Sequence, residues 1–349
     1  MTQIREIRAE AEWVSPSNLA IVKYWGKKNI QEPLNPSISF TLRQAVTRTR
    51  IKAEPAVEGG FTFSLNGKVK ESFNDKIEAF MLHARRHLPF IRKHHLYIES
   101  SNTFPHSSGI ASSASSMSAL ALGLIELHNL SLGKEDTQPD RMMASGLARL
   151  GSGSAARSVY GGWTLWGRFE GLKGSSDMYA IPVEEVADDF KTIRNAILII
   201  DPAKKKVSSS EGHSLMDFHP YRDARIGQAK DHTERLLGIL KDGDWDEFFE
   251  IAENEALSLH GLMMSSTPSY TLLHPNTISA LALIREARAG GLTIGFSMDA
   301  GPNVHLLYPA SEEEKVRSFI EKELSALCHE QKLIYDEIGP GPERNIDEI

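Results

Sequence analysis

Residues 102–132 read NTFPHSSGIASSASSMSALALGLIELHNLSL, and this stretch is the most informative part of the sequence. Its first half is rich in serine, glycine and alanine. In its second half apolar residues recur at helical spacing, as at Met117, Leu120, Ala121 and Leu124, which predicts a helix with a buried face. A loop of small residues therefore leads directly into a buried helix.

A loop of this kind can bind an anion when it is followed by a helix. Small side chains let the backbone approach a ligand closely, and the free N–H groups and the dipole of the first helical turn favour negative charge. The hydroxyl groups of Ser112 and Ser113 are suited to contact phosphate or Mg²⁺. The stretch matches neither the G-x-x-x-x-G-K-[ST] loop nor the G-x-G-x-x-G loop, and an ordinary capped, serine-rich helix start explains it equally well. The loop alone therefore does not establish a function.

The segments around this stretch mix strands and helices without strict βαβ alternation, which predicts an α+β fold. Residues 61–65, followed by Asn66-Gly67, indicate a β-hairpin. Near the end of the chain, Ser311 and Glu314 indicate a capping box at the start of the last helix.

Length and charge together predict two domains. A chain of 349 residues fits two domains better than one. The charged segment at residues 183–195 is the candidate boundary. We therefore expect an N-terminal domain at residues 1–187 and a C-terminal domain at residues 188–349.

The bulk composition restricts the possible partners. The net charge of −7 and the pI near 6.0 give no reason to expect binding to nucleic acid or to an anionic membrane. No apolar run is long enough for a membrane span, and the charged first residues lack the apolar core of a signal peptide. The single cysteine, Cys328, excludes a disulfide within the chain, which suits a reducing cytoplasm. An anionic ligand must then be held by a local cluster of cations.

Residues 15–27, SPSNLAIVKYWGK, contain two lysines four positions apart. Lys23 and Lys27 can hold a phosphate or a carboxylate as point charges, and Tyr24 between them adds a hydroxyl donor. A strand end with solvated lysines is the simpler alternative.

Two further segments combine small residues with one charged group. In residues 151–158, GSGSAARS, Arg157 is suited to hold a carboxylate through two parallel hydrogen bonds, although a flexible linker with a surface arginine has the same pattern. In residues 297–303, SMDAGPN, Asp299 lies where a strand enters a Gly-Pro turn. A turn aspartate that bonds its own backbone is common in that setting.

Together these segments resemble the mevalonate diphosphate decarboxylase family, a branch of the GHMP kinase superfamily. KYWGK at residues 23–27 and DAGPN at residues 299–303 are similar to the family's signatures almost letter for letter. PHSSGIASSA at residues 105–114 looks like its phosphate loop. The matching segments follow the family's order from residue 15 to residue 342.

Three positions depart from the family's pattern. Pro36 stands where a small or polar residue is usual. Ser210 occupies the position of an arginine in some bacterial members, and His213 replaces the usual methionine. The last two departures leave the recognition of the substrate phosphates open.

The resemblance implies the GHMP kinase fold, with an N-terminal ribosomal protein S5 domain 2-like domain and a C-terminal ferredoxin-like α/β sandwich. The active site is then expected in the cleft between these domains. The resemblance also implies a homodimer that uses ATP and Mg²⁺ to convert mevalonate 5-diphosphate into isopentenyl diphosphate, phosphate, ADP and CO₂. In that reaction ATP phosphorylates the 3-hydroxyl, and the new phosphate leaves as the carboxylate is lost.

Roles for individual residues follow from the same resemblance. Asp299 is the expected catalytic base, Lys23 is expected to lie near it and keep it ionised, and Arg157 is expected to hold the substrate carboxylate. The other substrate-binding residues are expected to be Tyr24, Lys27, Ser152, Ser154 and Ser209. Ser112 and Ser113 are expected near Mg²⁺. The ATP-binding residues are expected to be Pro105, Ser107, Ser108, Gly109, Ile110, Ala111, Ser112 and Ser113.

Other functions stay open for these residues. A sister enzyme on the same scaffold would decarboxylate mevalonate 5-phosphate or only phosphorylate the 3-hydroxyl, as a mevalonate 3-kinase. A mevalonate or homoserine kinase is less compatible with the KYWGK and DAGPN segments. A non-catalytic nucleotide-binding module differs from all of these because it would not consume ATP.

Overall fold

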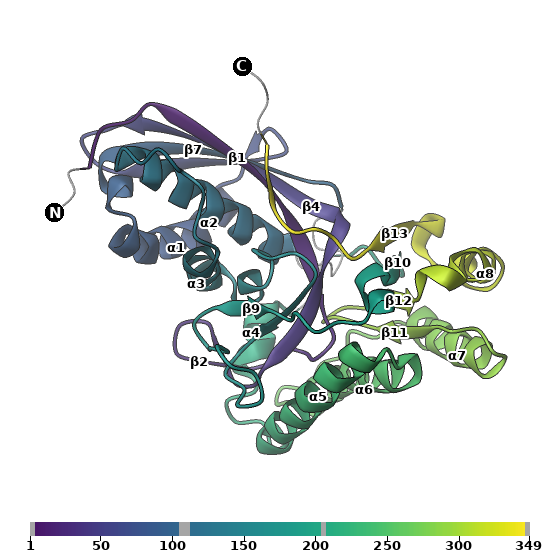
Figure 1. Ribbon diagram of the computed structural model, residues 1–349. Coiled ribbons are helices and arrows are strands. Elements are labelled where there is room, and N and C mark those ends of the chain that lie inside the picture. Colours follow the sequence, from purple (N-terminus) through teal and green to yellow (C-terminus); the bar gives the residue numbers. More distant parts are fainter. Residues whose placement is uncertain (1–3, 105–111, 204–206, 346–349) are drawn as a thin grey trace.

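The computed structural model describes residues 4–104, 112–203 and 207–345, and it contains two main sheets, each packed against helices (Figure 1). This mixture confirms the predicted α+β class. The division of the chain near residue 187 stays a prediction. No helix formed by the described residues is both long and apolar enough to cross a bilayer.

The first sheet has eight strands, in the order β14-β1-β4-β7-β5-β6, with β8 paired to β4 and β9 paired to β8. Its pairs are antiparallel except for β5 and β7, which are parallel. A separate hairpin consists of β2 (Lys27–Lys28) and β3 (Glu32–Pro33). The strands of the first sheet are β1 (Ala9–Ala20), β4 (Ser37–Pro55), β5 (Gly60–Leu65), β6 (Lys68–Val69), β7 (His94–Asn102), β8 (Trp163–Trp166), β9 (Ala180–Pro182) and β14 (Glu343–Arg344).

Strand β4 is the central element of this sheet. In its second half Thr47, Thr49 and Ile51 are buried, and the exposed residues between them are arginines. Because side chains alternate across a strand, one face packs against helices while the other meets solvent. The first residues of β4 pair with β8, and its later residues pair with β1 and β7. Strand β4 thus pairs with three other strands of the sheet.

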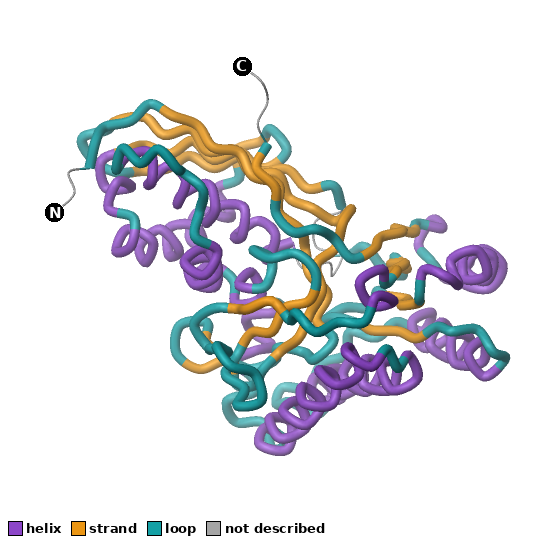
Figure 2. Tube along the Cα trace, in the orientation of Figure 1, coloured by secondary structure: helices purple, strands orange, loops and turns teal. Residues whose placement is uncertain are grey.

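Three helices cover the inner face of the first sheet, as Figures 1 and 2 show. They are α1 (Asn74–His87), α2 (Ser112–Ser131) and α3 (Arg141–Gly151). In α2 the side chains of Leu120 and Leu124 are buried, which confirms the predicted buried helix. A Cβ atom on Gly123 would lie 2.8 Å from Ile51 Cδ1, so the missing side chain lets α2 lie close to the sheet.

The second sheet is antiparallel throughout and has the order β11-β12-β10-β13. Its strands are β10 (Arg194–Leu198), β11 (Gly295–Ser297), β12 (Val304–Tyr308) and β13 (Leu333–Glu337). Apolar residues of this sheet form a buried core with α7 and α8. The helices of this part of the chain are α4 (Ser209–Ser214), α5 (Arg222–Asp242), α6 (Trp245–Met264), α7 (Pro275–Ala289) and α8 (Glu313–Phe319).

Two local predictions have opposite outcomes. Asn66 and Gly67 join β5 to β6 with φ values of 51° and 72°, which is the left-handed backbone that a two-residue hairpin turn needs. The predicted hairpin is therefore confirmed. The capping box at Ser311 is wrong, because that residue lies inside a 3-10 turn and α8 begins only at Glu313. The residue before the helix, Glu312, makes no side-chain capping hydrogen bond.

The last part of the chain returns to the first sheet. Asp336 on β13 accepts hydrogen bonds from the N–H groups of Arg43, Gln44 and Ala45 in β4, at 2.8 to 2.9 Å. Farther along, β14 pairs with β1 at the sheet edge. Contacts from the C-terminal residues thus connect the two sheets at the middle of β4.

Candidate active site

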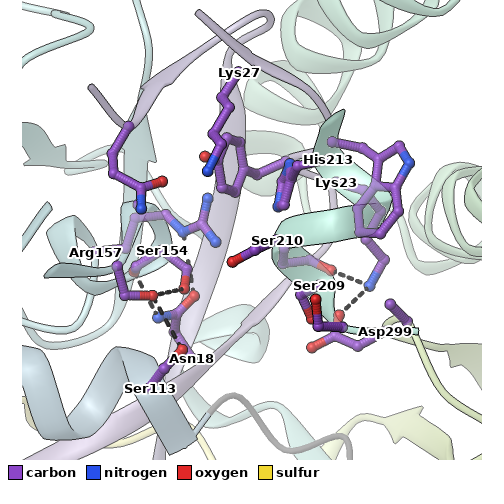
Figure 3. Close-up of a pocket in the computed structure, with 18 of the residues that line it drawn as sticks. Asn18, Lys23, Lys27, Ser113, Ser154, Arg157, Ser209, Ser210, His213 and Asp299 are labelled. Carbon is purple, nitrogen blue, oxygen red and sulfur yellow. Dashed lines mark hydrogen bonds and ion pairs between the residues drawn. The ribbon is translucent and has the colours of Figure 1, made fainter. Parts of the chain in front are cut away.

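One cavity of about 420 Å³ is lined by residues from both parts of the molecule (Figure 3), and its size is in the range of small-molecule sites. All predicted site residues that the structure describes line this cavity. The predicted residues Pro105, Ser107, Ser108, Gly109, Ile110 and Ala111 lie outside the described part of the chain. Those that line the cavity are Lys23, Tyr24, Lys27, Ser112, Ser113, Ser152, Ser154, Arg157, Ser209 and Asp299.

An ion pair between Lys23 and Asp299 joins the two parts of the site. Lys23 follows β1, and Asp299 follows β11 in the second sheet. The Lys23 Nζ atom lies 3.0 Å from Asp299 Oδ1, and it donates to Ser297 Oγ at 2.9 Å and to the Ala20 carbonyl at 2.6 Å. Because an ammonium group has three donors, these three acceptors define its orientation.

Exposure differs between the two members of this pair. The Lys23 side chain is 2% exposed, whereas that of Asp299 is 23% exposed, so the carboxylate is the group that a ligand can reach. Burial lowers the pKa of Lys23 below its ordinary value, and the charge of Asp299 opposes that effect. In turn, a close cation favours the ionised form of a carboxylate. An ionised carboxylate at a cavity surface can accept a proton from a substrate hydroxyl.

Arg157 supplies a second cation to the cavity. It follows a 3-10 turn, Gly153–Ala156, and is almost completely buried. Its Nε donates to Asn18 Oδ1 at 3.2 Å and its Nη1 to Ser37 Oγ at 2.6 Å. Both acceptors are neutral. Burial lowers the pKa of Arg157 to about 10, so the guanidinium stays charged at neutral pH and is suited to bind a ligand carboxylate.

Tyr24 presents a buried hydroxyl group that has no hydrogen-bond partner among the described residues. Its ring contacts Trp166 and His213, with centroids 4.7 and 4.3 Å apart. A Cβ atom on Gly153 would lie 2.8 Å from the Tyr24 hydroxyl oxygen, so only glycine leaves room there. Because a buried polar atom without a partner costs free energy, this hydroxyl is suited to bond a ligand oxygen.

Three serine hydroxyls connect the start of α2 with the Arg157 segment. Ser113 Oγ lies 3.0 Å from Ser152 Oγ, which in turn lies 3.5 Å from Ser154 Oγ. Ser112 and Ser113 are the first residues of α2, and both line the cavity. The first turn of this 20-residue helix therefore lines the same cavity as Arg157 and Asp299, and its positive end favours an anion there.

The α4 segment adds Ser209, Ser210 and His213 to the lining. The Gly26 N–H donates to His213 Nδ1 at 2.9 Å, so the other ring nitrogen carries the proton of the neutral imidazole. Burial lowers the pKa of His213 to about 3. This position, where the family usually has methionine, thus holds an uncharged imidazole beside Tyr24.

Sequence reasoning missed some of the lining residues. Lys76 lines the cavity from α1, and nothing in the basic sequence of that helix distinguishes it from its neighbours. Asn18 lies within the predicted cationic segment but had no assigned role. It orients Arg157 and donates to Ser158 Oγ at 2.8 Å and to the Ser154 carbonyl at 3.1 Å.

The charge of the cavity is opposite to that of the whole chain. Among the described residues that line it, the cations outnumber the single carboxylate, Asp299. The chain as a whole has a net charge of −7. The site therefore has the local cluster of cations that an anionic ligand requires. The cationic side chains are Lys23, Lys27, Lys76 and Arg157.

Comparisons with known proteins cover nearly the whole chain. Residues 15–180 match the diphosphomevalonate decarboxylase-like N-terminal domain, and residues 195–343 match the mevalonate 5-diphosphate decarboxylase C-terminal domain. Diphosphomevalonate decarboxylase mvd1 of Aspergillus fumigatus is 30% identical over 89% of this chain and 79% of its own length.

Solved structures agree with these matches. The mevalonate diphosphate decarboxylase of Staphylococcus aureus has a TM-score of 0.84 at 30% identity, covering 97% of this chain and 99% of that one. A structure described as MDDEF in complex with MVAPP, AMPPCP and magnesium has a TM-score of 0.83 at 29% identity, with coverage of 97% and 99%.

The fold, with its helix start aimed into a cationic cavity, defines a two-domain α+β protein of the GHMP kinase class. Both halves of the chain match domains of one particular branch, and its relatives align with it over most of their length. The chain belongs to the diphosphomevalonate decarboxylase family.

Proposed function

We propose that this chain catalyses the ATP-dependent decarboxylation of mevalonate 5-diphosphate to isopentenyl diphosphate, with release of ADP, phosphate and CO₂. One observation carries the proposal: the Lys23–Asp299 pair lies in the same cavity as Arg157 and the start of α2. Family membership and the relatives' names support the same reaction.

Asp299 is the proposed base. Its carboxylate, held ionised beside Lys23 at 3.0 Å, would accept the proton of the 3-hydroxyl as that oxygen attacks the terminal phosphate of ATP. The carbon–oxygen bond to the new phosphate then breaks as the bond to the carboxylate breaks and CO₂ departs, and the electron pair of the latter bond forms the carbon–carbon double bond of isopentenyl diphosphate. Holding the reacting groups in one geometry supplies much of the rate enhancement in reactions of this kind.

Arg157 is the proposed partner of the substrate carboxylate. Its buried guanidinium is held by the neutral Asn18 and Ser37, so its charge is available to an anion. We assign the diphosphate tail to Tyr24, Lys27, Ser152 and Ser209, which line the same cavity, and Ser154 is proposed as a further substrate-binding residue.

The nucleotide phosphates are proposed to bind at the start of α2. The hydroxyl oxygens of Ser112 and Ser113, which line the cavity there, are the protein groups that would hold Mg²⁺. Among the described residues no cluster of three or more His, Cys, Asp or Glu side chains could enclose a metal ion, which fits an ion held mainly by phosphate oxygens. Bound Mg²⁺ would neutralise charge on those phosphates.

A side-by-side assay tests the substrate. ATP-dependent CO₂ release would be measured with mevalonate 5-diphosphate and with mevalonate 5-phosphate. We expect turnover with the diphosphate. Preference for the monophosphate, phosphorylation without CO₂, or no ATP consumption would each favour one of the alternatives, namely the 5-phosphate decarboxylase, the 3-kinase or the non-catalytic module. Those alternatives have less support, because the relatives are named for the diphosphate.

Asp299→Ala tests the base. We expect turnover to fall by about three orders of magnitude or more, because no other carboxylate lines the described part of the cavity. Binding of mevalonate 5-diphosphate, measured by calorimetry, should weaken only modestly. Turnover close to that of the parent would remove Asp299 from the mechanism.

We also propose that the protein is a cytoplasmic homodimer. The single cysteine supports a reducing compartment, and the family resemblance supports the dimer. Light scattering coupled to size-exclusion chromatography would distinguish a dimer from a monomer of 38.7 kDa.

A further inference from the structure

The main chain of Lys23 is held by side chains rather than by a sheet. Residues 21–26 lie between β1 and β2 and belong to no strand. The Lys23 N–H donates to Glu255 Oε2 at 2.7 Å. Its carbonyl accepts from Arg225 Nη2 at 3.1 Å and from Asn35 Nδ2 at 3.0 Å. Because buried backbone groups need partners, these side chains replace the missing strand neighbours.

Glu255 is the centre of this arrangement. It lies on α6 with its side chain fully buried, and Arg225 on α5 grips both carboxylate oxygens at 2.6 and 2.5 Å. His232, also on α5, lies 2.7 Å from Oε1. Burial alone would raise the pKa of Glu255, but Arg225 and His232 lower it to about 2, so the group is ionised. A charged pair on two helices of the second part of the molecule therefore holds the backbone of a residue from the first part.

A neighbouring carboxylate on α6 forms similar ion pairs but does not contact Lys23. Glu253 lies two residues earlier on α6, is also buried, and pairs with Arg285 and Arg288 on α7. Two residues along a helix point about 200° apart, so the two carboxylates face different helices. Only Glu255 contacts the main chain of Lys23. Both glutamates thus connect α6 to another helix, but of the two only Glu255 contacts Lys23.

The ammonium group of Lys23 depends on the position of its own main chain. All three of its donors are engaged, and the acceptors are Ala20 in the first sheet, Ser297 in the second sheet and Asp299 just after that strand. A shift of the Lys23 backbone would break this set, and a displacement of about 1 Å in an active site can lower a rate about 100-fold.

We propose that Glu255 and Arg225 are positioning residues for the Lys23–Asp299 pair, acting by clamping the N–H and the carbonyl of Lys23 from the α5–α6 side. This inference rests on the proposed function of that pair. Neither residue touches the cavity, so they act on the reaction only through Lys23.

Glu255→Gln tests the clamp. An amide has one acceptor oxygen where the carboxylate has two, so its NH₂ group would face either Arg225 Nη1 and His232 or Arg225 Nη2 and the Lys23 N–H. We expect kcat to fall about 10- to 100-fold, while the KM values for ATP and for mevalonate 5-diphosphate stay within about threefold of the parent. Glu253→Gln is the control on the same helix, with a smaller loss in the urea midpoint because Arg285 and Arg288 are partly exposed, and with kcat within about twofold of the parent.

Three results would overturn the inference. The first is a Glu255→Gln protein that is less stable but has the kcat of the parent. The second is a Glu253→Gln protein that loses as much kcat. The third is a loss that appears in KM for ATP rather than in kcat.

Folding and function are checked within the same experiment. If Glu255→Gln does not fold, the double variant Glu255→Gln/Arg225→Gln removes both charges together. Its kcat is then expected to fall while its KM values stay near those of the parent. A parent protein without ATP-dependent CO₂ release would refute the proposed function. An active parent whose turnover is insensitive to Glu255 would refute only the clamp.

Discussion

Arg157 and Arg225 are buried to nearly the same degree, at 2% and 3% exposure, but their surroundings differ. Arg225 shares two short hydrogen bonds with the carboxylate of Glu255. Arg157 donates to an amide and a hydroxyl, which carry no charge. A buried cation with a carboxylate partner has its charge neutralised within the fold, and removing either partner destabilises the protein, whereas a cation held by neutral groups keeps its charge for a ligand. An arginine thus has a structural role at position 225 and is available to bind a ligand at position 157.

Removing Arg225 is expected to destabilise the protein more than any other change considered below. Arg225→Gln leaves the carboxylate of Glu255 buried without its main counter-charge, which we expect to lower the free energy of unfolding by about 4 kcal/mol. Urea unfolding followed by tryptophan fluorescence measures this loss. In Arg288→Gln the partner carboxylate, Glu253, keeps Arg285, so a smaller loss is expected. A loss of less than about 1 kcal/mol in Arg225→Gln would show that Glu255 does not depend on Arg225.

Removing Arg157, which has no carboxylate hydrogen-bond partner among the described residues, is expected to lower turnover rather than stability. Arg157→Gln should lower turnover by two to three orders of magnitude, about 3 to 4 kcal/mol in the activation barrier, because the substrate carboxylate loses its charged partner. The free energy of unfolding should change by less than about 1 kcal/mol, since no buried carboxylate loses a partner. Steady-state kinetics and urea unfolding measure the two quantities.

ATP affinity provides the control for Arg157→Gln. It should change much less than turnover, because the nucleotide phosphates are assigned to the start of α2. Equal losses of turnover and of ATP affinity in a folded protein would contradict a carboxylate role for Arg157.

The two buried arginine sites should also differ in how they make stability depend on pH. The folded-state pKa of Glu255, about 2, lies below the ordinary value of 4.5. Its ionised form therefore stabilises the fold fully above pH 4.5, and this contribution is lost as the pH falls from about 4.5 to about 2. The lost free energy is about 3 kcal/mol. Arg157 titrates near pH 10 and adds nothing in this acidic range.

Unfolding free energies measured between pH 6 and pH 3 test this expectation. The parent should lose stability across the range more steeply than Glu255→Gln, which has no carboxylate to protonate at that position. Parallel profiles for the two proteins would show that Glu255 is not responsible for the acid sensitivity.

The local parts of the fold and site were predictable from short sequence patterns. The spacing of Leu120 and Leu124 predicts the buried helix, and Asn66-Gly67 predicts the hairpin, because each pattern acts between near neighbours in the chain. KYWGK and DAGPN supply Lys23 and Asp299 through a family resemblance. The structure brings these two residues within 3.0 Å of one another, although their roles stay predictions.

Other features depend on partners that lie far away in the chain. Glu253 and Glu255 look alike in an acidic helix, and only the folded arrangement directs one to Arg288 and the other to Arg225. Lys76 belongs to a helix without any motif, and it reaches the cavity only because α1 packs beside α3. Ser311 is a residue type that often caps helices, but it lies within a 3-10 turn.

The edge strand β14 has a consequence for how the chain folds during synthesis. The ribosome delivers N-terminal residues first, and domains generally fold as units in that order. Glu343 and Arg344, which pair with Val14 and Trp13 in β1, are made only after the second sheet is complete. On the ribosome the β1 edge of the first sheet therefore stays unpaired until these residues are made. A nascent chain halted before residue 343 would expose that edge to other polypeptides.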